Sequence, residues 1–215
     1  MTSWKVFESP TSILIAGPSG SGKTYFVSRI LEDPQYYFKN VKNNIHYVHG
    51  SWQPAFASVE KRGIQFHENL PTVEDLDAWF SKTKGGILVL DDVMNEAVSS
   101  PHVVDLFTKH SHHRNINVIY LCQDLFPPGR YARPISRNAH YIIIFRNLRD
   151  SLATLHLLMQ SFGHEWKKAF QAYKEATSKV HGYLIINVHP RGNERCRLFT
   201  DVLKEEKPAR CFLDA

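Results

Sequence analysis

Short apolar runs alternate with longer amphipathic stretches along the chain. Uninterrupted apolar runs are typical of strands buried on both faces of a sheet, and they predict strands at residues 12–16, 45–48, 64–67, 87–90, 117–122 and 141–145. Apolar residues at helical spacing, bounded by Pro, Gly and Asp, predict helices from the first glycine-rich turn to about residue 31 and at 73–80, 101–112, 151–160 and 164–176. Strands that alternate with helices indicate an α/β fold with a mostly parallel central sheet.

The end of the chain has a different pattern. Residues 183–188 and 195–199 read as two strands joined across a Pro-Arg-Gly-Asn turn, which predicts a C-terminal β-hairpin. Arg191, Arg195 and Arg197 would alternate along this hairpin and lie on one face. There they could follow a phosphate backbone, or they could simply form a solvated face.

Composition limits the class of protein. With 215 residues and 43% hydrophobic content, we expect one domain over residues 1–215. The longest apolar runs are far shorter than the roughly 18 residues that a membrane span needs, so we expect no contact with a bilayer. The first residues lack the pattern of a secretory signal, and three cysteines, an odd number without a CxxC pair, suggest neither a disulfide framework nor a structural zinc site. We therefore expect an intracellular protein, and its net charge of +5 would suit a polyanionic partner without identifying one.

The most specific signal is a GxxxxGKT motif between the first predicted strand and the first predicted helix. It consists of Gly17, Pro18, Ser19, Gly20, Ser21, Gly22, Lys23 and Thr24. The glycines let successive backbone N–H groups point at phosphates, and the helix N-terminus adds partial positive charge. Lys23 would contact the β and γ phosphates of ATP, and the Thr24 hydroxyl would bind Mg²⁺.

Two later strands end in residues that could complete this site. The run ILVL is followed by Asp91 and Asp92. In open α/β sheets, ligands bind at the carboxyl ends of the strands. Asp91 would order the Mg²⁺ shell and Asp92 would polarise the attacking water, although the pair could also merely begin a loop. The next strand ends in Gln123, which could sense the γ phosphate. This order of parts favours an ATPase with an additional strand between the loop strand and the acidic strand.

These segments together resemble the FtsK/HerA superfamily of P-loop motors, and within it the viral genome-packaging ATPases of the poxvirus and Polinton/adintovirus types. The likeness lies in GPSGSGKT, ILVLDD, HRNINVIYLCQ and RNAHYIIIFRNLRD, which span residues 12–150. The superfamily commonly has Asp-Glu where this chain has Asp91-Asp92, so a shorter side chain must reach the water here.

The resemblance implies a homo-oligomeric ring, a pentamer or a hexamer, in which a neighbouring subunit inserts an arginine into the active site. Arg114 matches the family position best, and Arg130, Arg133 and Arg137 are alternatives in a basic loop at 127–138. Arg114 could also be an ordinary cation at a helix C-terminus.

We therefore expect an ATPase that translocates double-stranded DNA through backbone contacts and packages a viral genome into a capsid. The resemblance further implies a capsid or portal partner, in the host nucleus or cytoplasm or in the virion. Two other functions remain open. One is a nucleoside or nucleotide kinase of the P-loop class, and the other is a nucleotide-binding assembly protein with little hydrolysis.

Overall fold

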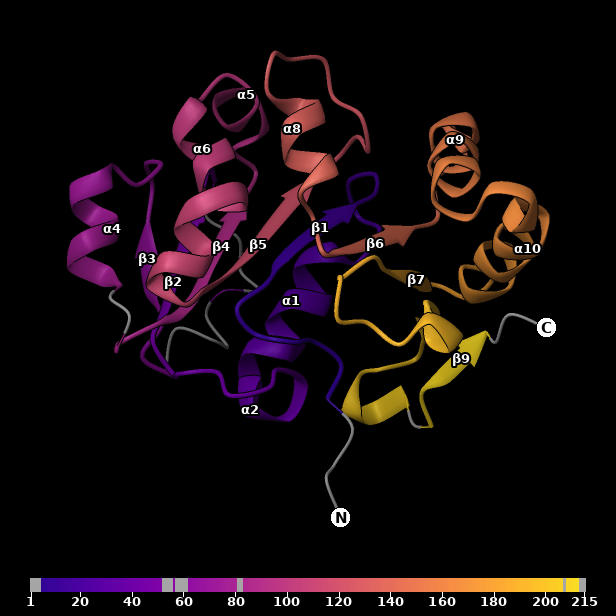
Figure 1. Ribbon diagram of the computed structural model, residues 1–215, viewed down its shortest axis with the longest axis horizontal. Coiled ribbons are helices and arrows are strands. Elements are labelled where there is room, and N and C mark those ends of the chain that lie inside the picture. Colours follow the sequence, from indigo (N-terminus) through magenta and orange to yellow (C-terminus); the bar gives the residue numbers. More distant parts are fainter. Residues whose placement is uncertain (1–4, 52–55, 57–61, 81–82, 207, 213–215) are drawn as a thin grey trace.

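One β-sheet forms the centre of the protein. The computed structural model describes residues 5–51, 56, 62–80, 83–206 and 208–212, without the side chains of residues 110, 112 and 194. The strands of this part are β1 (Ser12–Ala16), β2 (Ile45–His49), β3 (Gln65–His67), β4 (Gly86–Asp91), β5 (Ile116–Cys122), β6 (Tyr141–Phe145), β7 (Tyr183–Asn187), β8 (Leu198–Thr200) and β9 (Arg210–Phe212). Their spatial order is β3-β2-β4-β5-β1-β6-β7-β8-β9, from left to right in Figure 1. Neighbours from β3 to β6 are parallel, and those from β6 to β9 are antiparallel.

The helices connect these strands. The described α-helices are α1 (Lys23–Glu32), α2 (Pro34–Tyr37), α4 (Val73–Trp79), α5 (Met94–Ala97), α6 (Pro101–Asp105), α7 (Ser111–Arg114), α8 (Ala132–Arg137), α9 (Ser151–Phe162) and α10 (Trp166–Ala176). A π-helical segment, η2 (Leu106–His110), joins α6 to α7, and short 3₁₀ turns lie at η3 (Gly163–Glu165), η4 (Glu194–Cys196) and η5 (Lys204–Glu206).

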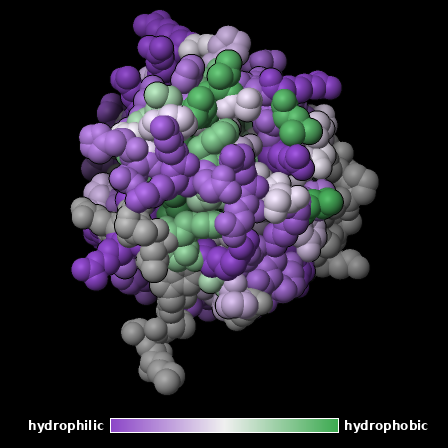
Figure 2. Space-filling view, turned by 90° about the vertical axis from the view of Figure 1, so that its right-hand side faces the viewer, coloured by the Kyte–Doolittle hydropathy of each residue, from purple (hydrophilic) through white to green (hydrophobic). Residues whose placement is uncertain are grey.

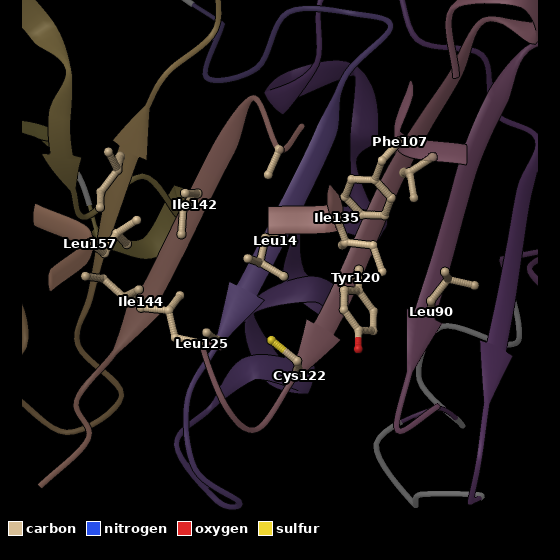
Figure 3. Packing of buried hydrophobic residues seen from close by; sticks show 14 of the residues in the cluster. Leu14, Leu90, Phe107, Tyr120, Cys122, Leu125, Ile135, Ile142, Ile144 and Leu157 are labelled. Atoms are coloured by element: carbon tan, nitrogen blue, oxygen red, sulfur yellow. The ribbon is translucent and has the colours of Figure 1, made fainter. Parts of the chain in front are cut away.

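Both faces of the sheet are covered because successive side chains of a strand point to opposite faces. In β1, Leu14 and Ala16 belong to one core cluster and Ile13 and Ile15 to the other. The first cluster includes residues of α4, α5, α6, α8, α9 and α10, whereas the second includes residues of α1 and α2. Figure 3 shows part of the first cluster around β1 and β5. Fully buried parallel strands explain the continuous apolar runs in the sequence.

Local signals fix the ends of several helices. The Asp33-Pro34 step ends α1, because a proline disfavours helical backbone angles at the residue that precedes it. The Thr72 hydroxyl accepts the backbone N–H of Asp75, whose carboxylate accepts the N–H of Thr72 in return. The proline step and the capping box therefore set where α1 ends and where α4 begins.

The predicted α/β fold is confirmed, with its mostly parallel sheet and C-terminal antiparallel strands. Two details differ. The segment 127–138 is not only a basic loop, because its second half forms α8. The helix that begins at Pro101 extends to Arg114 rather than 112, with π-helical geometry in its middle.

The prediction that the hairpin arginines share one strand face is wrong. β7 and β8 do pair antiparallel, but Arg195 lies in the turn η4 and Arg197 precedes β8. The Arg197 guanidinium stacks 4.5 Å from the Phe162 ring and donates a 3.0 Å hydrogen bond to the carbonyl of Ser161. The strand is shorter than its apolar pattern suggested because the chain turns tightly after Asn193, so these arginines do not form a row.

The cysteines, which suggested no disulfide framework, do form one disulfide. Cys196 and Cys211 are bonded, with their Cα atoms 5.9 Å apart. Strand β9, which sequence reasoning missed, pairs with β8 and brings Cys211 beside η4. Cys122 is a free thiol, and burial raises its pKa to about 12.

Among the described residues, no helix is long and apolar enough to cross a bilayer. Figure 2 shows the side of the molecule with α9, α10 and β9 as mostly hydrophilic, with apolar side chains in separate patches. Leu152 and Met159 of α9 are exposed. The larger apolar residues otherwise lie mainly in the two core clusters.

Candidate active site

The GxxxxGKT segment forms a loop between β1 and α1. Gly20 and Gly22 have φ angles of +74° and +106°, a region that residues with a Cβ rarely adopt. A Cβ on Gly17 would lie 2.7 Å from the Cβ of Phe145 on β6, so only glycine fits there. Each of these glycines is therefore required by backbone geometry or by a close approach. The loop has the curled form that the sequence predicts.

Lys23 begins α1 and points back into the loop. Its ammonium donates hydrogen bonds of 2.6 and 3.0 Å to the carbonyls of Gly17 and Pro18. Burial lowers the pKa of Lys23, and the negative charges of Asp91 and Asp92 oppose that shift. A half-buried cation held at the mouth of a loop of backbone N–H groups is suited to an anionic ligand.

Asp91 ends β4 as a buried carboxylate and is only 4% exposed. One of its oxygens, Oδ2, accepts a 2.7 Å hydrogen bond from the Tyr47 hydroxyl and a 3.3 Å hydrogen bond from the Thr24 hydroxyl. Burial raises the pKa of Asp91, while these two donors and Lys23 act in the opposite direction. The carboxylate and the Thr24 hydroxyl thus meet beside the loop. Hard oxygen ligands of this kind fit Mg²⁺.

Asp92 occupies the turn after β4. Its φ is +56°, and its side chain is exposed. Gly50, which follows β2, donates its N–H to the carbonyl of Asp91 over 3.0 Å. A Cβ on Gly50 would lie 2.2 Å from the carbonyl oxygen of Asp92. The close approach of Gly50 therefore holds the backbone turn that presents Asp92.

One cavity of about 460 Å³ joins these parts. The loop contributes Lys23 and Thr24, β4 contributes Asp91 and Asp92, and β5 contributes Gln123 just after its last residue. β5 lies between β1 and β4, as Figure 3 shows through Leu14, Tyr120 and Leu90 on the three neighbouring strands. The structure therefore brings the predicted phosphate loop, acidic pair and Gln123 together in one cavity. The additional strand that the sequence order predicts is β5, between β1 and β4.

Arg114 lies elsewhere. It precedes β5, whereas Gln123 follows it, and a strand of seven residues separates them by roughly 23 Å at ~3.3 Å per residue. The Arg114 guanidinium is mostly buried and pairs with Asp77 on α4, with a 2.9 Å bond from Nε. This position matches the alternative interpretation of Arg114 as a cation at a helix C-terminus. Within one subunit it cannot contact the cavity.

Several residues of the site gave no local sequence signal. Tyr47 and Gly50 support the acidic pair from β2, far from the motif in sequence. His181, from the turn before β7, packs against Gly22 and lies 3.1 Å from the carbonyl of Ser21 through Nδ1. Only the spacing of Tyr47 and Gly50 around the end of an apolar strand could have pointed to this edge of the sheet.

Arg146 and Arg149 were also missed. They line a second cavity of about 530 Å³, which shares Ser19 and Gln123 with the first. The loop that carries them is fixed by Asn147, whose side chain accepts the N–H groups of Arg149 and Asp150. Two more cations thus lie beside the phosphate loop.

Comparisons with known proteins identify the fold. No protein-family model matches the chain, and the comparison with curated proteins found no match. Among solved structures, the genome packaging NTPase B204 from Sulfolobus turreted icosahedral virus 2, in complex with ATP-γS, is similar with a TM-score of 0.54. It is 15% identical, and the match covers 83% of this chain and 92% of that chain.

Two further matches are looser. Cdc6p from Pyrobaculum aerophilum has a TM-score of 0.36 and 16% identity over 62% of this chain and 38% of that chain. The N-terminal domain of zonular occludens toxin from Neisseria meningitidis has a TM-score of 0.37 and 13% identity over 66% of this chain and 80% of that chain. TM-scores this low carry no argument by themselves. The sheet order, the loop between β1 and α1 and the likeness to B204 agree that this chain is an α/β domain with the P-loop NTPase fold.

Proposed function

We propose that the protein is an ATPase that translocates double-stranded DNA and packages a viral genome into a capsid. The observation that carries this proposal is the single cavity lined by Lys23, Asp91 and Gln123, with β5 inserted between the other two strands. The fold is also similar to that of B204, a viral genome packaging NTPase. A kinase of the P-loop class would need an acceptor site in addition to this cavity.

The chemistry follows from the positions of these side chains. On binding ATP, the Lys23 ammonium would exchange the carbonyls of Gly17 and Pro18 for the β and γ phosphate oxygens. Thr24 and Asp91 would hold Mg²⁺, which neutralises charge on the phosphates. Ionising Asp91 is unfavourable in its buried position, so a bound cation would stabilise the charged carboxylate.

The attacking water needs a base and an orienting group. Asp92 is the proposed base, because it is the exposed carboxylate that lines the cavity directly after β4. Gln123 is the proposed sensor of the γ phosphate. Both side chains extend from strand ends fixed by the sheet, so a change at the phosphate can be transmitted to the segments that follow them.

In a ring of identical subunits, a neighbouring subunit would insert one further arginine into the active site. A trans arginine of this kind is worth about 10³ to 10⁵ in rate, or roughly 4 to 7 kcal/mol at about 1.36 kcal/mol per decade. Arg114 is the proposed finger, and this role requires its ion pair with Asp77 to open against the neighbouring subunit. Within the same proposal, a capsid or portal protein is a partner, and the protein acts in the infected cell, in the nucleus or cytoplasm, or with the virion.

The test is steady-state ATP hydrolysis with and without duplex DNA, with sedimentation velocity in parallel. The proposal predicts that DNA stimulates turnover and that a ring-sized species sediments with nucleotide. Turnover stimulated by a nucleoside and unaffected by DNA would instead support a kinase. Nucleotide binding without phosphate release, even with DNA and capsid protein, would support an assembly role.

A further inference from the structure

Another cavity lies between α8 and α9, apart from the nucleotide cavity and from the cavity that Arg146 and Arg149 line. Its volume is about 680 Å³. Arg130, Arg133 and Arg137 line it from the segment around α8, and Gln160 and Ser161 line it from α9. Leu157 contributes to an apolar floor and also belongs to the core cluster in Figure 3. We call this cavity the arginine groove.

The charge of the arginine groove is not compensated. None of the described residues that line it is an Asp or a Glu. All three arginines are exposed, and none of them forms an ion pair within the described part of the chain. By contrast, Arg29, Arg114 and Arg210 each pair with a carboxylate. Three guanidinium groups without a counter-charge raise the local concentration of anions, and a ligand with several fixed negative charges would fit best.

Two segments of the chain connect the residues that line the arginine groove with those that line the nucleotide cavity. The chain from Gln123, which lines the nucleotide cavity, leads directly to Arg130. Helix α5, which also lines that cavity, ends beside Val98, whose carbonyl accepts the N–H of Tyr131 over 3.1 Å. A Cβ on Gly129 would lie 2.5 Å from the Val98 side chain, so the chain is held tightly there. Arg130 therefore stands between two residues that are fixed to the end of α5.

We propose that the arginine groove binds the phosphodiester backbone of the translocated DNA. This inference rests on the proposed function and adds the place where the substrate is held. Arg133 and Arg137 are four residues apart on α8, so they lie on one face and can contact neighbouring phosphates. Gln160 and Ser161 on the opposite wall are neutral hydrogen-bonding groups, which suit sugar and phosphate oxygens rather than one base sequence. Movement of α5 at the nucleotide would then move the groove.

The test compares two double variants with the same change of charge. Arg133→Ala with Arg137→Ala removes two cations from the groove, and Lys167→Ala with Lys174→Ala removes two exposed cations of α10 outside it. Affinity for a fluorescein-labelled duplex of random sequence is measured by anisotropy over a series of salt concentrations. The groove variant should bind about tenfold or more weakly for each lost contact. The slope of log binding constant against log salt concentration should become shallower by about 0.9 for each lost phosphate contact. The control should bind like the unaltered protein.

Melting curves show whether both variants are folded, and Arg133→Lys with Arg137→Lys should keep most of the affinity. Equal losses in the groove variant and the control would overturn the inference and leave DNA translocation standing. If the groove variant kept its affinity for duplex DNA but lost ATP turnover measured without DNA, the inference would be overturned and the arginines would be assigned a role in hydrolysis. Absence of duplex binding by the unaltered protein would overturn the proposed function as well. Binding of an acidic peptide, but not of duplex, would assign the groove to a protein partner instead.

Discussion

The buried hydrogen bond between Tyr47 and Asp91 gives a sharp test of how the acidic strand end is held. Tyr47 lies on β2 and is fully buried, and its hydroxyl donates a 2.7 Å bond to the nearly buried carboxylate of Asp91. Tyr47→Phe removes this donor and leaves the ring in place. The other side-chain donor to that oxygen among the described residues, the Thr24 hydroxyl, is more distant at 3.3 Å.

The size of the effect depends on the charge of Asp91. A hydrogen bond to a charged group contributes about 1.5 to 3 kcal/mol, whereas one between neutral groups contributes about 1 kcal/mol. Since the Tyr47 hydrogen bond lowers the pKa of Asp91, its removal should raise that pKa further. The loss of stability should therefore be about 2 kcal/mol where Asp91 is ionised and about half of that where it is protonated.

The assay is urea unfolding at several pH values. With a slope near 2 kcal/mol per M, the midpoint should fall by about 1 M at high pH and by less in acid. Tyr120→Phe is the matched control, because its buried hydroxyl has no hydrogen-bond partner among the described residues. If the two variants shifted the midpoint equally, or if the Tyr47 effect did not vary with pH, the proposed support of Asp91 would be refuted.

Three further predictions concern other parts of the structure. Gly50→Ala would place a Cβ 2.2 Å from the carbonyl oxygen of Asp92, so it should cost about 1 to 3 kcal/mol in urea unfolding and also slow ATP turnover; unchanged turnover would contradict the role of this turn. Burial, with the nearby His67, lowers the pKa of His46 from 6.5 to about 4, so folding favours the neutral imidazole. The free energy of unfolding should therefore fall by roughly 2 kcal/mol as the pH is lowered from 7 to 5. The His46→Gln variant should not show this loss. Reduction of the Cys196–Cys211 disulfide, which closes a separation of 15 residues, should lower the free energy of unfolding by about 3 kcal/mol, and equal stability with and without reductant would contradict this.

Much of the fold could be predicted because its strands carry strong local signals. β1 and β4 are buried along their whole length and carry the continuous apolar runs Ile13–Ala16 and Ile87–Leu90, since both faces of a parallel sheet are covered. The C-terminal strands were harder. β9 is short and mostly exposed, so it lacks an apolar pattern. The disulfide depends on the pairing of β9 with β8, which neither the number nor the spacing of the cysteines reveals.

In the active site, too, residues within a local sequence pattern were predictable, whereas residues that reach the site through the tertiary fold were not. The phosphate loop was predictable because its chemistry requires glycines and Lys23 at fixed spacing. Asp91 and Gln123 were predictable as polar residues at the ends of apolar strands. Tyr47 and His181 were not, because each meets the site only through the tertiary fold. The ion pair of Arg114 with Asp77 likewise depends on the packing of α4, which no local pattern contains.

ATP hydrolysis by the Lys23→Ala variant tests most directly whether the phosphate loop and the acidic pair form one catalytic centre. Lys23 lies at the point where the loop, Asp91 and Asp92 meet in one cavity. Turnover should fall by at least about a hundredfold, the usual cost of removing a group that stabilises transition-state charge, while the melting temperature without nucleotide should stay close to that of the unaltered protein. Undiminished hydrolysis by the folded variant would show that this loop and these acids do not form the catalytic centre.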